Sequence, residues 1–301
     1  MKSPKIIECK PEDVQVIHTG CELGEGVLWD EFHQEILWTD ILGKKIYFWA
    51  WMTGQLEVHE LEQRLCSISL VEGPNKNTYL FAFESGVALW DRQTQSCEWI
   101  EKINQPEGVR LNDGRTDRQG RFWVGSMGEG ELTSKRMGQL YCVDRGKVTA
   151  HADGIGISNG LCWSPDSATM YFADSLENKI EKIQFGSTQG KLVERKDWVR
   201  TPQGVSPDGS CVDQDGYVWN AQWGGSRVIR YRPDGDEDVI LSLPMSQPSC
   251  VCFAGPELDT LAVTSAKQGL TPQQLNHDAH AGNVFLIKLP YRGLLESRYI
   301  S

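Results

Sequence analysis

Short segments in which apolar and polar residues alternate recur along the chain, separated by turn-forming residues. Residues 25–49, 159–185 and 208–233 share one plan. In each of them an acidic or amide residue precedes Gly, and a short apolar run, a polar turn, a second apolar run and a third, alternating run follow. Alternation with a period of two is typical of half-buried β-strands, and no segment has the periodicity of a long amphipathic helix. The pattern therefore predicts an all-β protein.

The same plan recurs in segments that begin near Cys66, Asn112 and Ser249. Equivalent positions follow one another at intervals of roughly 41 to 49 residues, the length of a four-stranded propeller blade. These positions are Glu25, Ser67, Asp113, Asn159, Asp208 and Ser249. We therefore predict that residues 1–301 form a single domain, a six-bladed β-propeller of four-stranded blades. An open pair of β-sandwich sheets is the alternative, since sandwiches also contain regularly spaced short strands.

The segment VQVIH at residues 14–18 precedes the first repeat and has the character of a strand. We expect it to supply the outer strand of the last blade. This pairing would close the ring and remove its free edges.

Composition excludes several classes of function. The chain carries 41 acidic and 30 basic residues, a formal net charge of −11, so a phosphate backbone would be repelled and nucleic acid is not an expected partner. No apolar run reaches the roughly 18 residues that cross a bilayer, and the N-terminus lacks the apolar core of a signal peptide, so we expect a cytoplasmic protein without a membrane partner. The nine scattered cysteines are expected to be reduced thiols.

Oxygen-donor side chains stand at the same place in four of the repeats. Glu25, Asp113 with its neighbour Asn112, Asn159 and Asp208 lie where an inner strand begins near the central channel, so they should converge at one end of it. Taken singly, Asp-Gly and Asn-Gly pairs are common turns. Here the pairs precede the apolar run, whereas the evident turns follow it. Carboxylate and amide oxygens suit Ca²⁺, Mg²⁺ or Mn²⁺ and are less typical of Zn²⁺. We therefore expect a central site for one divalent cation.

Five motifs resemble the SMP-30/regucalcin/gluconolactonase family of six-bladed propellers, in the family's order and over essentially the whole chain. They are LGEGVLWD (23–30), RLNDGRTDRQGRFWVGSM (110–127), ISNGLCWSPD (157–166), YFADS (171–175) and SPDGSCVDQDGYVWNAQWGG (206–225). The resemblance implies that Glu25, Asn159 and Asp208 bind the metal, that Asp208 is also the general base, and that Arg110 and Asn112 contact the substrate. Relatives often carry a further sugar-binding Glu shortly after the Met of the second motif. Here Met127 is followed by Gly-Glu-Gly-Glu, and we assign the contact to Glu129.

The resemblance further implies metal-dependent hydrolysis of a sugar lactone, such as glucono-, galactono-, xylono- or arabinonolactone, to the aldonic acid. The polar side chains of Arg110 and Asn112 favour this reading, because a pure ion site does not require them. The alternatives are a calcium-binding or regulatory propeller without turnover, and another metal-dependent esterase or phosphotriesterase on the same scaffold, because fold alone does not fix function.

Three other signals compete with this interpretation. Residues 156–160 match G-x-S-x-G, which would make Ser158 a nucleophile, but the motif requires a following helix and a strand pattern follows instead. His277 and His280 lie in a polar stretch expected to be a loop of the last blade, and a metal role is not expected for them. Trp223 is expected to pack in the core, with the channel mouth as the alternative.

Overall fold

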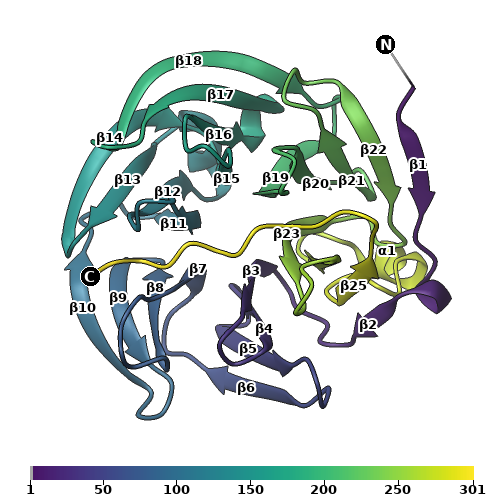
Figure 1. Ribbon diagram of the computed structural model, residues 1–301, viewed down its shortest axis with the longest axis horizontal. Helices are drawn as coiled ribbons and strands as arrows, with labels where there is room; N and C mark the ends of the chain where they lie inside the picture. Colours follow the sequence, from purple (N-terminus) through teal and green to yellow (C-terminus); the bar gives the residue numbers. More distant parts are fainter. Residues whose placement is uncertain (1–2) are drawn as a thin grey trace.

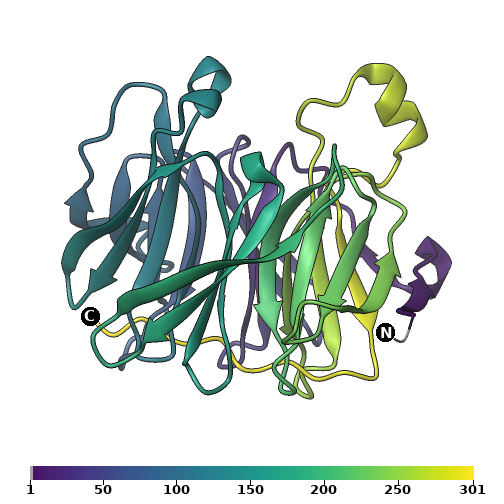
Figure 2. The ribbon, with the colours of Figure 1, turned by 90° about the horizontal axis from the view of Figure 1, so that it is seen from above.

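Six β-sheets stand like blades around a central channel in the computed structural model, which describes residues 3–301 (Figures 1 and 2). The first blade contains β3 (Gly24–Asp30), β4 (Glu35–Asp40), β5 (Lys45–Ala50) and β6 (Leu56–Glu60). The second contains β7 (Leu65–Leu70), β8 (Thr78–Phe83), β9 (Gly86–Asp91) and β10 (Ser96–Lys102). The third contains β11 (Val109–Thr116), β12 (Phe122–Gly128), β13 (Gly138–Asp144) and β14 (Lys147–Ile155).

The remaining three blades follow in chain order. The fourth contains β15 (Ser158–Trp163), β16 (Thr169–Asp174), β17 (Lys179–Gly186) and β18 (Lys191–Arg200). The fifth contains β19 (Ser206–Val212), β20 (Val218–Trp223), β21 (Arg227–Tyr231) and β22 (Glu237–Ser242). The sixth contains β23 (Pro248–Ala254), β24 (Thr260–Ser265), β25 (Val284–Lys288) and the N-terminal β2 (Gln15–Ile17). The predicted six-bladed propeller is confirmed, and the sandwich alternative is wrong.

The N-terminal segment closes the ring, as predicted. Strand β2 pairs antiparallel with β25, with Val16 opposite Phe285, so the last blade combines strands from both ends of the chain. A further strand, β1 (Lys5–Glu8), pairs parallel with β22 and gives the fifth blade a fifth strand that the repeat pattern did not predict.

Apolar clusters fill the spaces between neighbouring blades. Each of the six clusters joins residues of two adjacent sheets. Between the third and fourth blades, for example, Trp123 packs edge-on against Phe185 with ring centroids 5.7 Å apart. Burial of a large apolar side chain stabilises a fold by roughly 1.5–3 kcal/mol. The alternation in the sequence thus places the core between the blades and leaves the polar residues at the inner strand starts near the channel.

A β-bulge interrupts the innermost strand pair of every blade at the equivalent place. The register shifts fall between Glu25 and Leu28, Leu65 and Ser67, Leu111 and Gly114, Asn159 and Cys162, Pro207 and Ser210, and Pro248 and Val251. A bulge bends its strand and redirects side chains, and it often lies beside a functional site. Gly26 and Gly160 adopt left-handed φ values of 60° and 65° there, which explains the Gly after the polar residue.

The two ends of the channel differ (Figure 2). The loops of one face carry the short 3₁₀-helix η2 (Gly130–Lys135) and helix α1 (Pro272–His277). Helix α1 lies in the stretch predicted to be a loop, and Thr271 and Gln274 form a capping box at its start. Nδ1 of His277 donates a hydrogen bond to the Gln273 carbonyl at 2.8 Å. The remaining 3₁₀-helices are η1 (Pro11–Asp13) and η3 (Ser175–Glu177).

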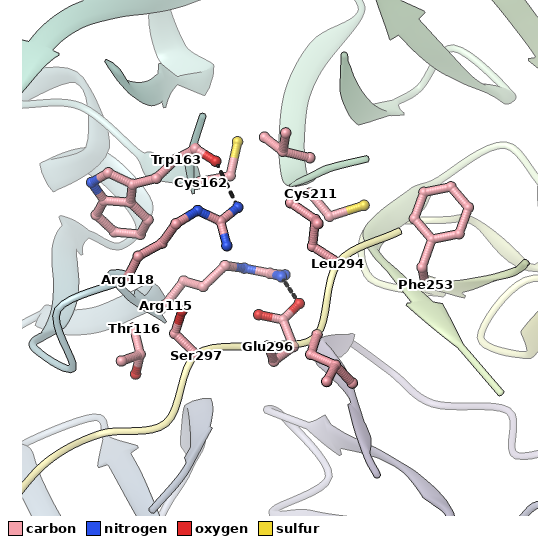
Figure 3. Close-up of a pocket in the computed structure, with 12 residues that line it drawn as sticks. Arg115, Thr116, Arg118, Cys162, Trp163, Cys211, Phe253, Leu294, Glu296 and Ser297 are labelled. Carbon is pink, nitrogen blue, oxygen red and sulfur yellow. Dashed lines mark hydrogen bonds and ion pairs between the residues drawn. The ribbon is translucent and has the colours of Figure 1, made fainter. Parts of the chain in front are cut away.

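The C-terminal segment, residues 289–301, crosses the opposite face of the ring (Figures 1 and 2). Its backbone is held by several blades: Gln214 donates to the Arg292 carbonyl at 2.9 Å, and Tyr299 donates to the Leu70 carbonyl at 2.8 Å. Beneath the channel Glu296 pairs with Arg115 (Figure 3). The space left beside this pair is about 30 Å³, enough for no more than about two water molecules. The segment therefore seals this end of the channel.

Within residues 3–301, no helix is both long and apolar enough to cross a membrane. The same residues contain no disulfide bond.

Candidate active site

A cavity of about 410 Å³ lies at the end of the channel opposite the C-terminal segment. Five of the residues singled out in the sequence line it, from four different blades: Glu25, Arg110, Asn112, Asn159 and Asp208. The remaining lining residues are Leu23, Met127, Ile157, Ser175, Ser206, Trp223, Gln247, Gln268 and Gly269. The structure thus brings together four side chains that the repeat pattern placed at one end of the channel, namely Glu25, Asn112, Asn159 and Asp208.

Two carboxyl groups of the cavity are buried close to each other. Glu25 is 8% exposed and Asp208 is 6% exposed. Burial, with the charge of Asp113 as a second cause, raises the pKa of Glu25 to about 8. Burial, the charge of Glu25 and that of Asp113 raise the pKa of Asp208 well above its usual range. Within residues 3–301, Oδ1 of Asp208 has no hydrogen-bond partner. The buried carboxyl groups of the site therefore outnumber the cationic side chains that could neutralise them.

Two asparagines are fixed beside these acids by a chain of hydrogen bonds. Nδ2 of Asn112 donates to Oδ1 of Asn159 at 2.9 Å and to the Ser158 carbonyl at 2.9 Å. Nδ2 of Asn159 donates to Oγ of Ser175 at 2.8 Å, and this hydroxyl donates to the Pro207 carbonyl at 2.6 Å. The amide nitrogen of Asn159 is thus engaged by Ser175, and its Oδ1, which accepts from Asn112, keeps a second lone pair that could bind a cation.

Arg110 is held on the other side of Asn112. Its Nη1 donates to Oδ1 of Asn112 at 2.6 Å and to the Leu111 carbonyl at 2.9 Å, and its Nε donates to Glu129 at 3.0 Å. Among the described residues Nη2 of Arg110 has no hydrogen-bond partner, which leaves a donor for a ligand in the cavity.

Glu129 is not among the residues that line the cavity. Its carboxylate contacts two arginines, Arg110 and Arg64, and the distance from Oε1 to Nη1 of Arg64 is 2.8 Å. The structure therefore places this residue behind Arg110, and a direct sugar contact by Glu129 stays a prediction from the resemblance.

Two residues named in the sequence lie outside the cavity. Oδ2 of Asp113 accepts a hydrogen bond from the Leu161 backbone at 3.2 Å, which ties the third blade to the fourth. Ser158 is fully buried, and a Cβ on Gly125 would lie 1.7 Å from its Oγ. Strand β16, not a helix, follows β15. Ser158 therefore lacks both the exposure and the context of a hydrolase nucleophile, as expected.

Several lining residues were not assigned to the site from the sequence. Trp223, expected in the core with the channel mouth as the alternative, lines the cavity and also packs against one of the apolar clusters. Gln247 directly precedes β23, one of the two inner strands that carry no acidic or amide residue before Gly, and its Nε2 donates to the carbonyls of Ala266 and Gln268 at 3.1 Å each. Ser175, by contrast, belongs to the motif YFADS, and this motif is a sequence signal that could have identified it.

The donor set for a cation is mixed. Within the part of the chain that the structure describes, no three His, Cys, Asp or Glu side chains are grouped so as to hold a metal ion by themselves. The expected set consists of two carboxylates and the amide of Asn159, and the unpartnered Oδ1 of Asp208 fits a role as a ligand. The site chemistry is thus compatible with a hard divalent cation.

Comparisons with known proteins agree with this picture. A putative sugar lactone lactonase of Rhizobium meliloti is 33% identical, with 92% of this chain and 94% of the relative covered. The L-arabinolactonase of Azospirillum brasilense is 33% identical, with 92% of each chain covered. The crystal structure of a calcium-binding protein, regucalcin, from Agrobacterium tumefaciens superposes with a TM-score of 0.92 at 28% identity and 99% coverage of both chains.

A family model also matches most of the chain. The model described as the SMP-30/gluconolactonase/LRE-like region matches residues 23–267, from the first motif to the end of β24. The matched range contains every residue of the predicted site. The chain therefore belongs to the SMP-30/gluconolactonase/LRE-like family.

Proposed function

We propose that the protein hydrolyses a sugar lactone to the corresponding aldonic acid. The observation that carries the proposal is the carboxylate of Asp208, which is buried at the cavity with an unpartnered oxygen. A buried carboxylate that lines a polar cavity and keeps an oxygen without a partner is a candidate general base. The names of two relatives, a putative sugar lactone lactonase and an L-arabinolactonase, support lactone hydrolysis as the reaction.

Glu25, Asn159 and Asp208 would hold one divalent cation. Oxygen-only donors favour Ca²⁺, Mg²⁺ or Mn²⁺ over Zn²⁺, and the regucalcin relative is described as calcium-binding. When bound, the cation supplies a Lewis acid that offsets the negative charge that develops on the lactone carbonyl oxygen.

The chain's own residues would do the rest. Asp208 would orient a water molecule and take its proton, and it would later return the proton to the ring oxygen as the C–O bond breaks. The free Nη2 of Arg110 would donate to a hydroxyl or the carbonyl of the sugar, and Oδ1 of Asn112 would accept from a hydroxyl. A site with such fixed polar groups distinguishes a polyol from an apolar ester.

The test is a pH-drop assay across glucono-, galactono-, xylono- and arabinonolactone, before and after removal of metal with a chelator. We expect turnover of at least one lactone, its loss on chelation and its return with added cation, while circular dichroism shows that the fold persists. Undiminished turnover by protein shown to be metal-free would contradict the proposed site.

A second candidate is a calcium-binding propeller without turnover, which the description of the regucalcin relative favours. Tight cation binding in calorimetry with no hydrolysis of any lactone would support it. A phosphotriester and a simple ester belong in the same assay, because hydrolysis of either one alone would identify a different hydrolase on this scaffold.

A further inference from the structure

A row of four charged side chains leads from the edge of the second blade to the cavity. Glu84 accepts a hydrogen bond from Nε of Arg64 at 2.6 Å. Nη1 and Nη2 of Arg64 donate to the two oxygens of Glu129 at 2.8 and 3.0 Å. Glu129 in turn accepts from Nε of Arg110 at 3.0 Å. The row therefore ends at the arginine that lines the cavity.

The row is anchored to the backbone at both ends. The Glu84 N–H donates to the Arg64 carbonyl at 2.9 Å, and the Glu84 carbonyl accepts from the N–H of Leu111, next to Arg110, at 3.1 Å. Arg64 stands just before β7, Glu84 follows β8, and Glu129 follows β12, so the row bridges the second and third blades. It is thus a fixed structure, in contrast to a pair of flexible surface side chains.

Burial strengthens the contacts of the row. The side chains of Glu84, Arg64 and Glu129 are 27%, 22% and 33% exposed, and that of Arg110 is 5% exposed. Charges that are mostly withdrawn from water interact more strongly than exposed ones. Although burial opposes it, the hydrogen bond from Arg64 keeps the pKa of Glu129 below its usual value. The carboxylate therefore stays charged between its two arginines.

The geometry gives Arg64 a specific effect on Arg110. The planar fork of Arg64 grips both oxygens of Glu129 and so fixes the plane of that carboxylate. One of these oxygens is also the acceptor for Nε of Arg110. Nε and Nη1 of Arg110 are thereby both engaged, which holds the plane of the guanidinium at the wall of the cavity. The negative charge of Glu129 is divided between Arg64 and Arg110. Arg110 is therefore only partly neutralised by this carboxylate.

We propose that Arg64, acting through Glu129 and held by Glu84, is a positioning residue that orients the guanidinium of Arg110 for substrate binding. The proposal rests on the proposed function in one respect, that Arg110 contacts the lactone. Glu129 then holds Arg110 in place by accepting the hydrogen bond from its Nε.

The first test is kinetic, with the cation at saturation. We expect Arg64→Met to raise KM for the best lactone by about 10-fold, the size of effect that a misplaced binding group produces, while kcat stays within about 3-fold. A rise in KM at nearly constant kcat indicates the loss of an interaction that stabilises the bound substrate and the transition state equally. In Arg64→Lys, KM should lie between the values of the parent and of Arg64→Met, because lysine keeps the positive charge but lacks the planar guanidinium that donates to both oxygens of Glu129.

Arg92→Met is the matched control. Arg92 also joins two glutamates, Glu35 and Glu57, and is 12% exposed, but it does not line the cavity. Its loss should lower stability much as Arg64→Met does and leave KM unchanged. An equal rise of KM in both variants, or no rise in Arg64→Met, would overturn the proposal.

The second test observes Arg110 directly and needs no turnover. In ¹⁵N NMR spectra the Nε–H signal of Arg110, identified by its disappearance in Arg110→Lys, should be protected from solvent exchange in the parent. We expect exchange about 10-fold faster in Arg64→Met and unchanged in Arg92→Met. Unchanged protection in Arg64→Met would refute the positioning role, whereas a parent without lactone turnover but with this exchange pattern would refute only the proposed function.

Discussion

At the scale of single residues, the alternation of side chains along a strand gives neighbours in the sequence opposite surroundings. Ser158 packs beneath Gly125 away from the cavity, while Asn159 lines it. Ser158→Ala should therefore keep activity within about 3-fold, because its hydroxyl has no partner to lose among the described residues. Asn159→Ala should lose most activity, because a proposed cation ligand and the contact to Asn112 disappear together. Initial rates on one lactone, with melting curves as a check on folding, decide the ranking; the reverse order would revive the serine mechanism.

Asp208 allows a separation of its two proposed roles. Asp208→Asn keeps an oxygen that can bind a cation but cannot accept a proton near neutral pH. At saturating cation we expect a folded protein whose kcat falls by roughly 10²–10⁴, the usual contribution of general base catalysis. If kcat stays within a few-fold of the parent value, Asp208 is a ligand only, and Glu25 becomes the next candidate for the base.

The residues of the site were largely predictable because their signal is repeated. Glu25, Asn159 and Asp208 stand before Gly at equivalent points of three repeats, and all three line the cavity. Asp113 has the same sequence signal, yet its carboxylate binds the backbone of the next blade. The direction of a side chain beside a bulge depends on the neighbouring sheet, and a sequence pattern does not contain that information.

At the scale of elements, alternation predicted strands well and short irregular pieces poorly. Strand β1 pairs parallel with β22, more than two hundred residues away, and its Ile6 is 64% exposed, so no burial pattern marked it. Helix α1 has six residues, which is too few for a helical periodicity to emerge. Its capping box and the Pro at its start were the available signals.

The closure of the ring by β2 can be measured through one buried side chain. Ile17 is 7% exposed and belongs to the apolar cluster between the sixth and first blades. Ile17→Ala should lower the free energy of unfolding by about 2–5 kcal/mol, the cost of a large-to-small change in a core. The exposed Gln15 on the same strand is the control, and Gln15→Ala should stay within about 0.5 kcal/mol of the parent in urea unfolding. Equal effects of the two changes would mean that β2 does not fasten the ring.

At the scale of the whole molecule, the propeller followed from the repeat, and the family followed from the order of the motifs. The course of the C-terminal segment was not predictable from the sequence. Residues 289–301 have no alternation of apolar and polar residues, and they contact the blades through separate, individual hydrogen bonds and side chains. Tyr299 is fully buried, and its hydroxyl accepts a hydrogen bond from the Gly146 backbone at 2.8 Å. Such contacts depend on side chains from several blades that meet only after the ring has formed.

Among residues 3–301, the ion pair of Glu296 and Arg115 closes the floor of the channel, which makes the cavity a blind pocket that is open at its mouth. A ligand must therefore enter end first, and nothing can thread through the ring. We expect a lactone extended at one position to be hydrolysed with kcat/KM within about 10-fold of the simple lactone, whereas a lactone carrying bulky groups on opposite sides of its ring should not react. Competition assays with such paired analogues measure this directly, and equal hydrolysis of both kinds would mean that the floor opens. A blind pocket would thus confine the proposed reaction to small lactones and to the ends of larger molecules.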